Sequence, residues 1–249
     1  MKLVLRIWRQ QRAEVPGAFQ EYPVDDASPD MTVLELLDRL NEDLAEHGVD
    51  PVAFDSDCRE GICGSCGITI DGVPHGPVRN VATCNQHVRS FTDGSTITLE
   101  PFRTGSFPVV RDLVVDRSAL DRLLAAGGFI SVDAGTAPDA DASLTTHAAA
   151  ELALDFAACI GCGACVAACP NGAAHLFAGA KLAHLAISGR GSAERGRRAL
   201  AIADQLDAEF GPCSTHGECV EVCPSRIPLT AVATVNRERL RASWRRRDD

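Results

Sequence analysis

Hydrophobic and polar residues alternate near the N-terminus and then change to a helical spacing. Residues 2–8 and 18–22 alternate as β-strands do, with a turn at Pro16-Gly17 between them. Between residues 31 and 44 the apolar side chains recur every three or four positions, which predicts a helix that begins near Thr32. Two more strands are predicted over residues 68–70 and 95–99. The first hundred residues should therefore form a small sheet with one helix.

The remainder of the chain has mainly helical patterns. Residues 111–124 show helical spacing, whereas residues 125–146 are rich in Ala, Gly, Asp and Thr and predict a connecting segment over the surface. Three later helices are expected over residues 173–185, 194–210 and 227–240. The fold class is thus predicted to be α+β.

Composition narrows the class of protein. The chain has 249 residues, of which 45% are hydrophobic and 23% charged, as in a globular protein. No apolar run approaches the roughly 20 residues that span a bilayer, and the N-terminus does not resemble a signal peptide. A net charge of −10 argues against a general nucleic-acid binder. Eleven cysteines without an export signal indicate a reducing compartment, in which thiols bind metals rather than form disulfides.

The first group of cysteines has the spacing C-x4-C-x2-C-x17-C. This is the plant-type pattern for a [2Fe–2S] cluster, and the glycines between the cysteines let backbone amides approach the sulfur atoms. A zinc knuckle is the alternative. The pattern predicts a β-grasp ferredoxin-like domain over residues 1–105. The expected ligands are Cys58, Cys63, Cys66 and Cys84.

A second run, C-x2-C-x2-C-x3-C-P, ends at Cys169-Pro170. In chains with this run, the fourth cysteine ligates a cluster other than the one bound by the first three. The run therefore predicts a complementary group elsewhere, and Cys213, Cys219 and Cys223-Pro224 are available. Zinc and disulfide bonds are the alternatives, although structural zinc sites usually use two separated cysteine pairs.

Crossed pairing then divides these seven cysteines between two clusters. The predicted [4Fe–4S] ligands are Cys159, Cys162, Cys165 and Cys223. The other cluster would be bound by Cys169, Cys213 and Cys219. Because the stretch between Cys213 and Cys219 contains His216 and no thiol, this cluster is expected to be [3Fe–4S], unless His216 or a water completes a cube. Residues 151–249 are expected to form an all-α domain like the bacterial ferredoxins, which residues 106–150 connect to the first domain.

The chain resembles the iron–sulfur subunit of succinate dehydrogenase and fumarate reductase, respiratory complex II. The resemblance covers nearly the whole chain and is most specific at residues 58–66, at residues 107–116 and at the two Cys-Pro runs. It implies an oxidoreductase subunit that is not catalytic alone. Electrons would pass from the FAD of a flavoprotein partner through [2Fe–2S], [4Fe–4S] and [3Fe–4S] clusters to a quinone at a membrane anchor. The resemblance also implies a peripheral location on the cytoplasmic side of the membrane.

Two departures from the family pattern concern the quinone. Ubiquinone-reducing members have a Trp pair within the segment that corresponds to residues 171–177, and a His often follows the cysteine equivalent to Cys213, where this chain has Ser214. A menaquinone partner and a different anchor are therefore a hypothesis, and His175 is either a pocket residue or an ordinary interfacial histidine. The basic residues 245–247 are either solvated or face anionic lipid.

Other functions are compatible with parts of the sequence. No Ser/His/Asp set, paired-carboxylate site or P-loop is visible, so the chain is expected to carry electrons rather than catalyse by itself. Fumarate reduction, a soluble polyferredoxin, a subunit of another flavoprotein reductase and a zinc-binding interaction protein are the alternatives. The sequence leaves open the physiological direction, the quinone, the type and haem content of the anchor and the oligomeric state.

Overall fold

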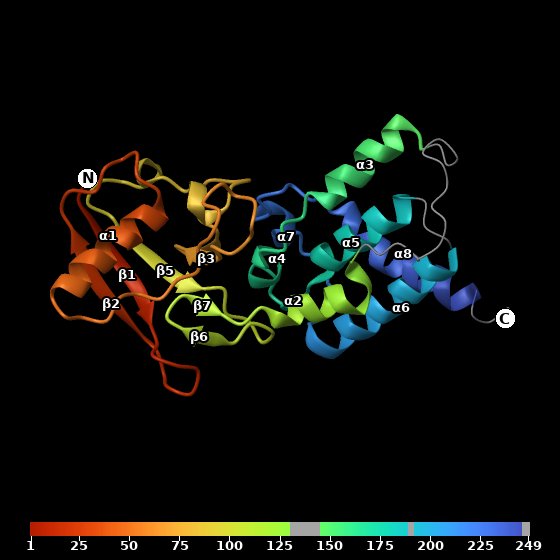
Figure 1. Cartoon of the computed structure of the whole chain (residues 1–249), viewed down its shortest axis with the longest axis horizontal. Coiled ribbons are helices and arrows are strands. Elements are labelled where there is room, and N and C mark those ends of the chain that lie inside the picture. Colours follow the sequence, from red (N-terminus) through yellow and green to blue (C-terminus); the bar gives the residue numbers. More distant parts are fainter. Residues whose placement is uncertain (130–144, 189–191, 246–249) are drawn as a thin grey trace.

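The fold was analysed in a computed structural model that describes residues 1–129, 145–188 and 192–245. A β-sheet with one helix forms one end of the molecule, and a group of helices forms the other (Figure 1). A short hairpin lies between them. The α+β class predicted from the sequence is confirmed.

The N-terminal part is built on a mixed five-stranded sheet with the strand order β2-β1-β5-β3-β4. Strands β1 and β5 are parallel neighbours at its centre, and the other pairs are antiparallel. The alternating pattern of β1 places Leu3, Leu5 and Ile7 in the core. The strands are β1 (Leu3–Arg9), β2 (Ala18–Val24), β3 (Ile68–Ile70), β4 (Val73–Pro74) and β5 (Thr96–Pro101).

Helix α1 (Val33–Glu46) belongs to the hydrophobic core of this sheet. Its start is fixed by a capping box, in which the Glu35 amide donates to Thr32 Oγ1 at 3.2 Å and the Thr32 amide donates to Glu35 Oε2 at 2.7 Å. The predicted start near Thr32 is therefore confirmed. Two short 3-10 turns, η1 (Thr83–Asn85) and η2 (Val88–Ser90), follow in the segment that carries Cys84.

The helix predicted over residues 111–124 is wrong in its first half. Strands β6 (Val109–Arg111) and β7 (Val114–Val115) form a hairpin there, and helix α2 (Ser118–Leu123) begins only afterwards. Asp112 stands at the turn with a φ of 46°, outside helical geometry. Its buried carboxylate accepts hydrogen bonds from Gln10 N at 2.8 Å and Ala53 N at 2.9 Å, so it fastens the hairpin to the sheet.

The second half is helical. Helices α5 (His175–Ile187) and α8 (Thr230–Arg245) approach closely at Gly179, where an added Cβ would stand 2.1 Å from the carbonyl oxygen of Ala231. Phe102 and Phe107 are fully buried in the hydrophobic cluster of these helices, although they follow directly after the N-terminal sheet. Besides the five-residue π-helical turn η3 (Leu124–Gly128), the helices are α3 (His147–Ala157), α4 (Ala164–Ala167), α5 (His175–Ile187), α6 (Ser192–Glu209), α7 (Glu218–Glu221) and α8 (Thr230–Arg245).

The three late helices predicted from the sequence are confirmed as α5, α6 and α8, each shifted by a few residues. Helix α3 begins directly after the connecting segment predicted over residues 125–146, where no helix was predicted. Most of that segment, and Arg246 and Arg247 of the basic tail, lie outside the described residues. None of the helices in the described part of the chain is long and apolar enough to span a bilayer.

Candidate metal centres

The first candidate centre is the loop of residues 58–66 together with Cys84. Arg59, Gly61 and Gly64 have positive φ angles of 56°, 76° and 74°, so the loop curls back on itself. The curl directs backbone amides at sulfur: Cys63 N donates to Cys58 Sγ at 3.3 Å, and Ser65 N donates to Cys63 Sγ at 3.4 Å. Amides placed in this way stabilise negative charge on sulfur, as a cluster requires.

The four thiols of this loop differ in environment. Cys66 and Cys84 are buried, whereas Cys58 and Cys63 are partly exposed. Burial raises the pKa of Cys66 to about 12, and the charge of the neighbouring Cys84 thiolate also raises it. Burial also opposes ionisation of Cys63, but hydrogen bonds from Ser65 outweigh it and lower the pKa of that thiol to about 7. The loop therefore places Cys63, whose ionised form is favoured by hydrogen bonds, near Cys66, whose ionised form is disfavoured by burial.

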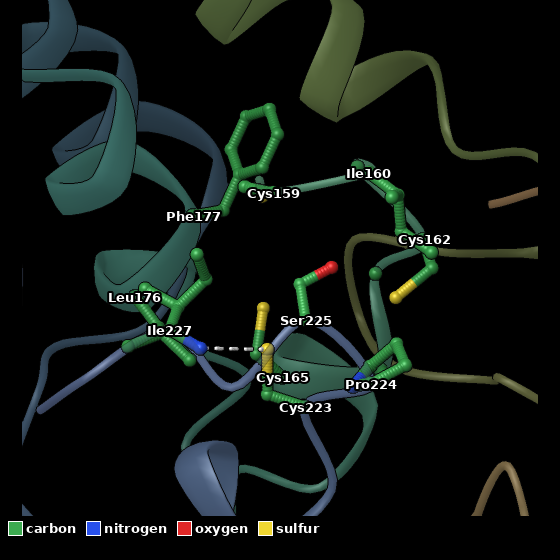
Figure 2. Close-up of a pocket in the computed structure, with 13 residues that line it drawn as sticks. Cys159, Ile160, Cys162, Cys165, Leu176, Phe177, Cys223, Pro224, Ser225 and Ile227 are labelled. Carbon is green, nitrogen blue, oxygen red and sulfur yellow. Dashed lines mark hydrogen bonds between the residues drawn. The ribbon is translucent and has the colours of Figure 1, made fainter. Parts of the chain in front are cut away.

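The second candidate centre is a pocket lined by cysteines from two distant stretches of the chain (Figure 2). Three of them come from the first Cys-Pro run, and Cys223 comes from the second run. Ile227 N donates to Cys223 Sγ at 3.4 Å. Leu176 and Phe177 of α5 supply apolar walls. The cysteines at this pocket are Cys159, Cys162, Cys165 and Cys223.

The third candidate centre is a neighbouring pocket, lined by Cys169, Cys213 and Cys219. His175 and His216 also line it. Asn171 holds the two sides together, because its Nδ2 donates to Pro212 O at 2.9 Å and to Ser214 Oγ at 2.8 Å. Cys169 therefore faces the later cysteines and not the three that precede it in the sequence.

The two Cys-Pro segments repeat one backbone conformation. In the first, Gly161 and Gly163 flank Cys162 with φ angles of 68° and 86°, and α4 follows. In the second, residues 215 and 217 flank His216 with φ angles of 56° and 102°, and α7 follows. His216 thus occupies the position in the second loop that Cys162 occupies in the first.

The donor set fits iron–sulfur clusters in chemical terms. Burial raises the pKa of Cys162 to about 12 and that of Cys165 well above its ordinary value, so free thiolates are disfavoured at these positions. Cationic iron would compensate for that penalty. Among the described residues, no group of three His, Cys, Asp or Glu side chains meets at a single-ion site. The thiols of the second and third centres instead surround pockets.

Two features near the centres were not found from the sequence. Arg117 makes hydrogen bonds to backbone carbonyls of both cysteine loops. His75 is 1% exposed, its Nδ1 accepts from Thr83 N at 3.2 Å, and its Nε2 has no hydrogen-bond partner within the described part of the chain. The contacts of Arg117 join residues at least 45 positions apart in the sequence, so no local motif could have revealed them. His175 Nδ1 is likewise buried and has no partner there.

Comparison with known protein families assigns both halves of the chain. Residues 4–122 match the family described as a 2Fe-2S iron-sulfur cluster binding domain. Residues 158–227 match the 4Fe-4S dicluster domain family. The first match contains the loop of residues 58–66, and the second contains all seven cysteines of the other two candidate centres.

Relatives match over most of their length. The succinate dehydrogenase iron-sulfur subunit of Bacillus subtilis is 28% identical, over 93% of this chain and 90% of its own. The fumarate reductase iron-sulfur subunit of Mycobacterium tuberculosis is 32% identical, over 91% and 87%. The Escherichia coli fumarate reductase iron-sulfur subunit is 31% identical, over 87% and 83%.

The fold has also been seen in a solved structure. A chain of the Mycobacterium smegmatis Sdh1 complex in the apo form superposes with a TM-score of 0.69 at 22% identity, covering 98% of this chain and 96% of that chain. The arrangement of a sheet domain followed by helices is therefore shared along the full length. With relatives above 30% identity over more than two thirds of their length, the chain belongs to the family of iron–sulfur subunits of succinate dehydrogenase and fumarate reductase.

Proposed function

We propose that this chain holds three iron–sulfur clusters and passes single electrons along them within a succinate:quinone oxidoreductase. The observation that carries the proposal is the crossed arrangement of the cysteines. Cys223 joins the first three cysteines of the central run at one pocket, while Cys169 joins the later pair at the next. Two-cluster ferredoxins cross their ligands in the same way.

The ligand sets follow from this arrangement. The [2Fe–2S] cluster is assigned to Cys58, Cys63, Cys66 and Cys84. The [4Fe–4S] cluster is assigned to Cys159, Cys162, Cys165 and Cys223. The third pocket supplies three thiols, Cys169, Cys213 and Cys219, which suit a [3Fe–4S] cluster. Such clusters accept and release one electron at a time.

The two halves are proposed to be a β-grasp ferredoxin domain over residues 1–105 and a bacterial-ferredoxin-like helical domain over residues 151–249. The parallel pairing of β1 with β5 and the position of α1 in the same core support the first name. The repeated Gly-helix-Cys-Pro segments support the second. Residues 106–150 connect the two.

The named relatives belong to succinate dehydrogenase and fumarate reductase, so the partners are proposed by membership of the family. A flavoprotein subunit with FAD would supply electrons from succinate to the [2Fe–2S] centre. A membrane anchor would hold menaquinone or ubiquinone beside the third centre, on the cytoplasmic side of the membrane. His175 is the candidate quinone-side residue, because it lines the third pocket with a buried Nδ1 that has no partner among the described residues.

Metal analysis and EPR spectra of the complex, purified from membranes through a tag on this chain, test the proposal. We expect about nine iron atoms per chain, the total for the three cluster types, and distinct signals from each. Zinc without iron or acid-labile sulfide would overturn it. A His175→Leu complex that keeps all three clusters and unchanged quinone reductase kinetics would remove His175 from the quinone site.

A further inference from the structure

Arg117 lies between the first two candidate centres and contacts the backbone of both. One guanidinium nitrogen, Nη1, donates to Gly64 O at 2.5 Å and to Cys162 O at 2.9 Å. The other, Nη2, donates to Ser65 O at 3.3 Å. A single side chain therefore joins the loop of residues 58–66 to the loop that carries Cys162.

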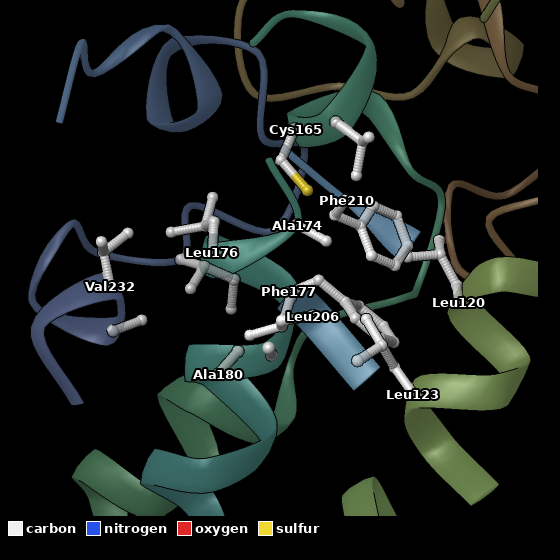
Figure 3. Packing of buried hydrophobic residues seen from close by; sticks show 14 of the residues in the cluster. Leu120, Leu123, Cys165, Ala174, Leu176, Phe177, Ala180, Leu206, Phe210 and Val232 are labelled. Atoms are coloured by element: carbon white, nitrogen blue, oxygen red, sulfur yellow. The ribbon is translucent and has the colours of Figure 1, made fainter. Parts of the chain in front are cut away.

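The position of Arg117 is itself fixed by local structure. It directly precedes α2, and Ser118 N, at the start of this helix, donates to Asp116 Oδ1 at 2.8 Å. Leu120 and Leu123 anchor α2 in the hydrophobic core of the helical half, close to the pocket of the second centre (Figure 3). The guanidinium is thus presented from the residue next to a helix that is packed into the core.

The hydrogen bond to Gly64 has a consequence for sulfur. The carbonyl of Gly64 and the amide of Ser65 belong to one planar peptide group and point in opposite directions. Arg117 binds the carbonyl end, and the amide end donates to Cys63 Sγ at 3.4 Å. A cation on the carbonyl polarises the amide toward the sulfur and strengthens that hydrogen bond.

The charge of Arg117 has a different environment from that of the paired arginines beside the core. Arg122, Arg195 and Arg59 each pair with a carboxylate. Arg117 pairs with none in the described part of the chain, and its hydrogen bonds go only to carbonyl oxygens. An uncompensated, partly buried positive charge stabilises added negative charge nearby more strongly than an exposed ion pair does. Reduction of either cluster adds such a charge.

We propose that Arg117 is a positioning residue that raises the reduction potential of the [2Fe–2S] centre and holds it against the [4Fe–4S] centre for electron transfer. This inference rests on the proposed function. Arg117 orients the Gly64–Ser65 peptide, supplies the positive charge, and fixes the contact between the two loops. With both clusters bound, one electron would pass from the first to the second and no atoms would be exchanged.

The test uses the whole complex with Arg117→Gln, which removes the charge, and Arg117→Lys, which keeps it. A lysine ammonium is a point charge and lacks the planar fork that binds several carbonyls in fixed geometry. Arg122→Gln is the matched control, since Arg122 lies on α2, which Arg117 precedes, but pairs with Glu209 at 2.5 Å. The midpoint potential of the [2Fe–2S] EPR signal and its microwave power saturation are measured, together with iron and sulfide content.

We expect Arg117→Gln to shift the [2Fe–2S] potential to a more negative value. In both Arg117 variants the reduced [4Fe–4S] cluster should enhance the relaxation of the [2Fe–2S] signal less than in the wild type, because the contact is looser. Arg122→Gln should match the wild type in both measurements. Unchanged potential and saturation in fully loaded Arg117 variants would overturn the inference.

Loss of both clusters from both Arg117 variants would also overturn it, in favour of a purely structural role. If only Arg117→Gln loses its clusters, Arg117→Lys alone tests the inference. Weaker relaxation of its [2Fe–2S] signal than in the wild type would support the inference, and unchanged saturation would overturn it. Absence of the [2Fe–2S] and [4Fe–4S] signals from the wild-type complex would instead contradict the proposed function, so the two failures are distinguishable.

Discussion

Gly64 and Ile160 lie in direct contact although one belongs to each half of the chain. A Cβ atom added to Gly64 would stand 2.5 Å from the carbonyl oxygen of Ile160 and 3.1 Å from the amide nitrogen of Cys162. Gly64 also has a φ of +74°, which disfavours any other residue. The glycine therefore allows the loops of the first two centres to touch.

Replacing Gly64 by alanine should separate these loops. The positive φ alone costs about 1–3 kcal/mol, and backbone atoms block the new methyl group. We expect Gly64→Ala to lower the midpoint of urea unfolding and to slow electron transfer from the first centre to the second, as followed by rapid-freeze EPR. Gly72→Ala is the matched control, because Gly72 also has a positive φ of 79° but nothing lies within 4 Å of its added Cβ.

Equal effects of the two substitutions on stability and on electron transfer would contradict this prediction. If Gly64→Ala and Gly72→Ala lose the same stability, and electron transfer is unaffected in both, the contact with Ile160 has no effect beyond backbone strain.

Arg195 and Glu238 form a buried ion pair between α6 and α8. The carboxylate of Glu238 is 2% exposed, and Arg195 Nη2 donates to its Oε1 at 2.6 Å. Burial opposes ionisation of Glu238, but the hydrogen bonds and charge of Arg195 outweigh it and lower its pKa. We expect Arg195→Met to reduce the free energy of unfolding by about 3–5 kcal/mol, because it leaves a buried carboxylate without its main partner.

The double variant Arg195→Met with Glu238→Leu provides the control for this ion pair. It removes both charges and should recover most of the lost stability, measured by urea unfolding. A double variant no more stable than Arg195→Met would show that packing, and not the unpaired charge, explains the loss.

His75 makes stability depend on pH. Burial lowers its pKa to about 4 from an ordinary value of 6.5. The unfolded chain therefore binds more protons between these values, and the stabilisation due to neutral His75 is present above pH 6.5 and is lost as the pH falls toward 4. The loss should reach about 3 kcal/mol.

Urea unfolding of the complex-bound chain at pH 7.5 and pH 5 measures this effect. His75→Gln cannot take up a proton, so its stability should fall less between the two pH values than that of the wild type. His47→Gln is the control, since His47 is exposed and hydrogen bonding to Asp43 raises its pKa rather than lowering it. Equal pH dependence in the wild type and His75→Gln would contradict the prediction.

A thiol at residue 216 should change the third cluster. His216 has the same place in its loop as Cys162 has in the first Cys-Pro run, between two residues of positive φ. We expect His216→Cys to replace the [3Fe–4S] signal of the oxidised complex by a [4Fe–4S] signal of the reduced complex. The iron content should rise by about one atom per chain.

The control for this substitution places a thiol beside the same pocket in a different register. Ser214→Cys introduces a cysteine next to Cys213, and it should leave the three-iron signal unchanged. If wild type already shows a four-iron cluster that His216→Ala converts to three irons, His216 is itself the fourth ligand.

The sequence reveals the cysteine loops but not how they meet. Spacing alone groups Cys58 with Cys63 and Cys66, and the Cys-Pro rule pairs Cys223 with the earlier run, because both depend on local loop geometry. The hairpin around Asp112 was mistaken for helix, since its stability comes from hydrogen bonds to Gln10 and Ala53. Such long-range contacts leave no periodic pattern in a single sequence.

The reduction of the centres by succinate tests the central claim most directly. The complex is purified gently from membranes through a tag on this chain, and low-temperature EPR spectra are recorded before and after succinate is added. The account predicts an oxidised [3Fe–4S] signal that succinate abolishes and a [2Fe–2S] signal that appears at the same time. Clusters that dithionite reduces but succinate does not would contradict it and favour a soluble electron carrier or another reductase.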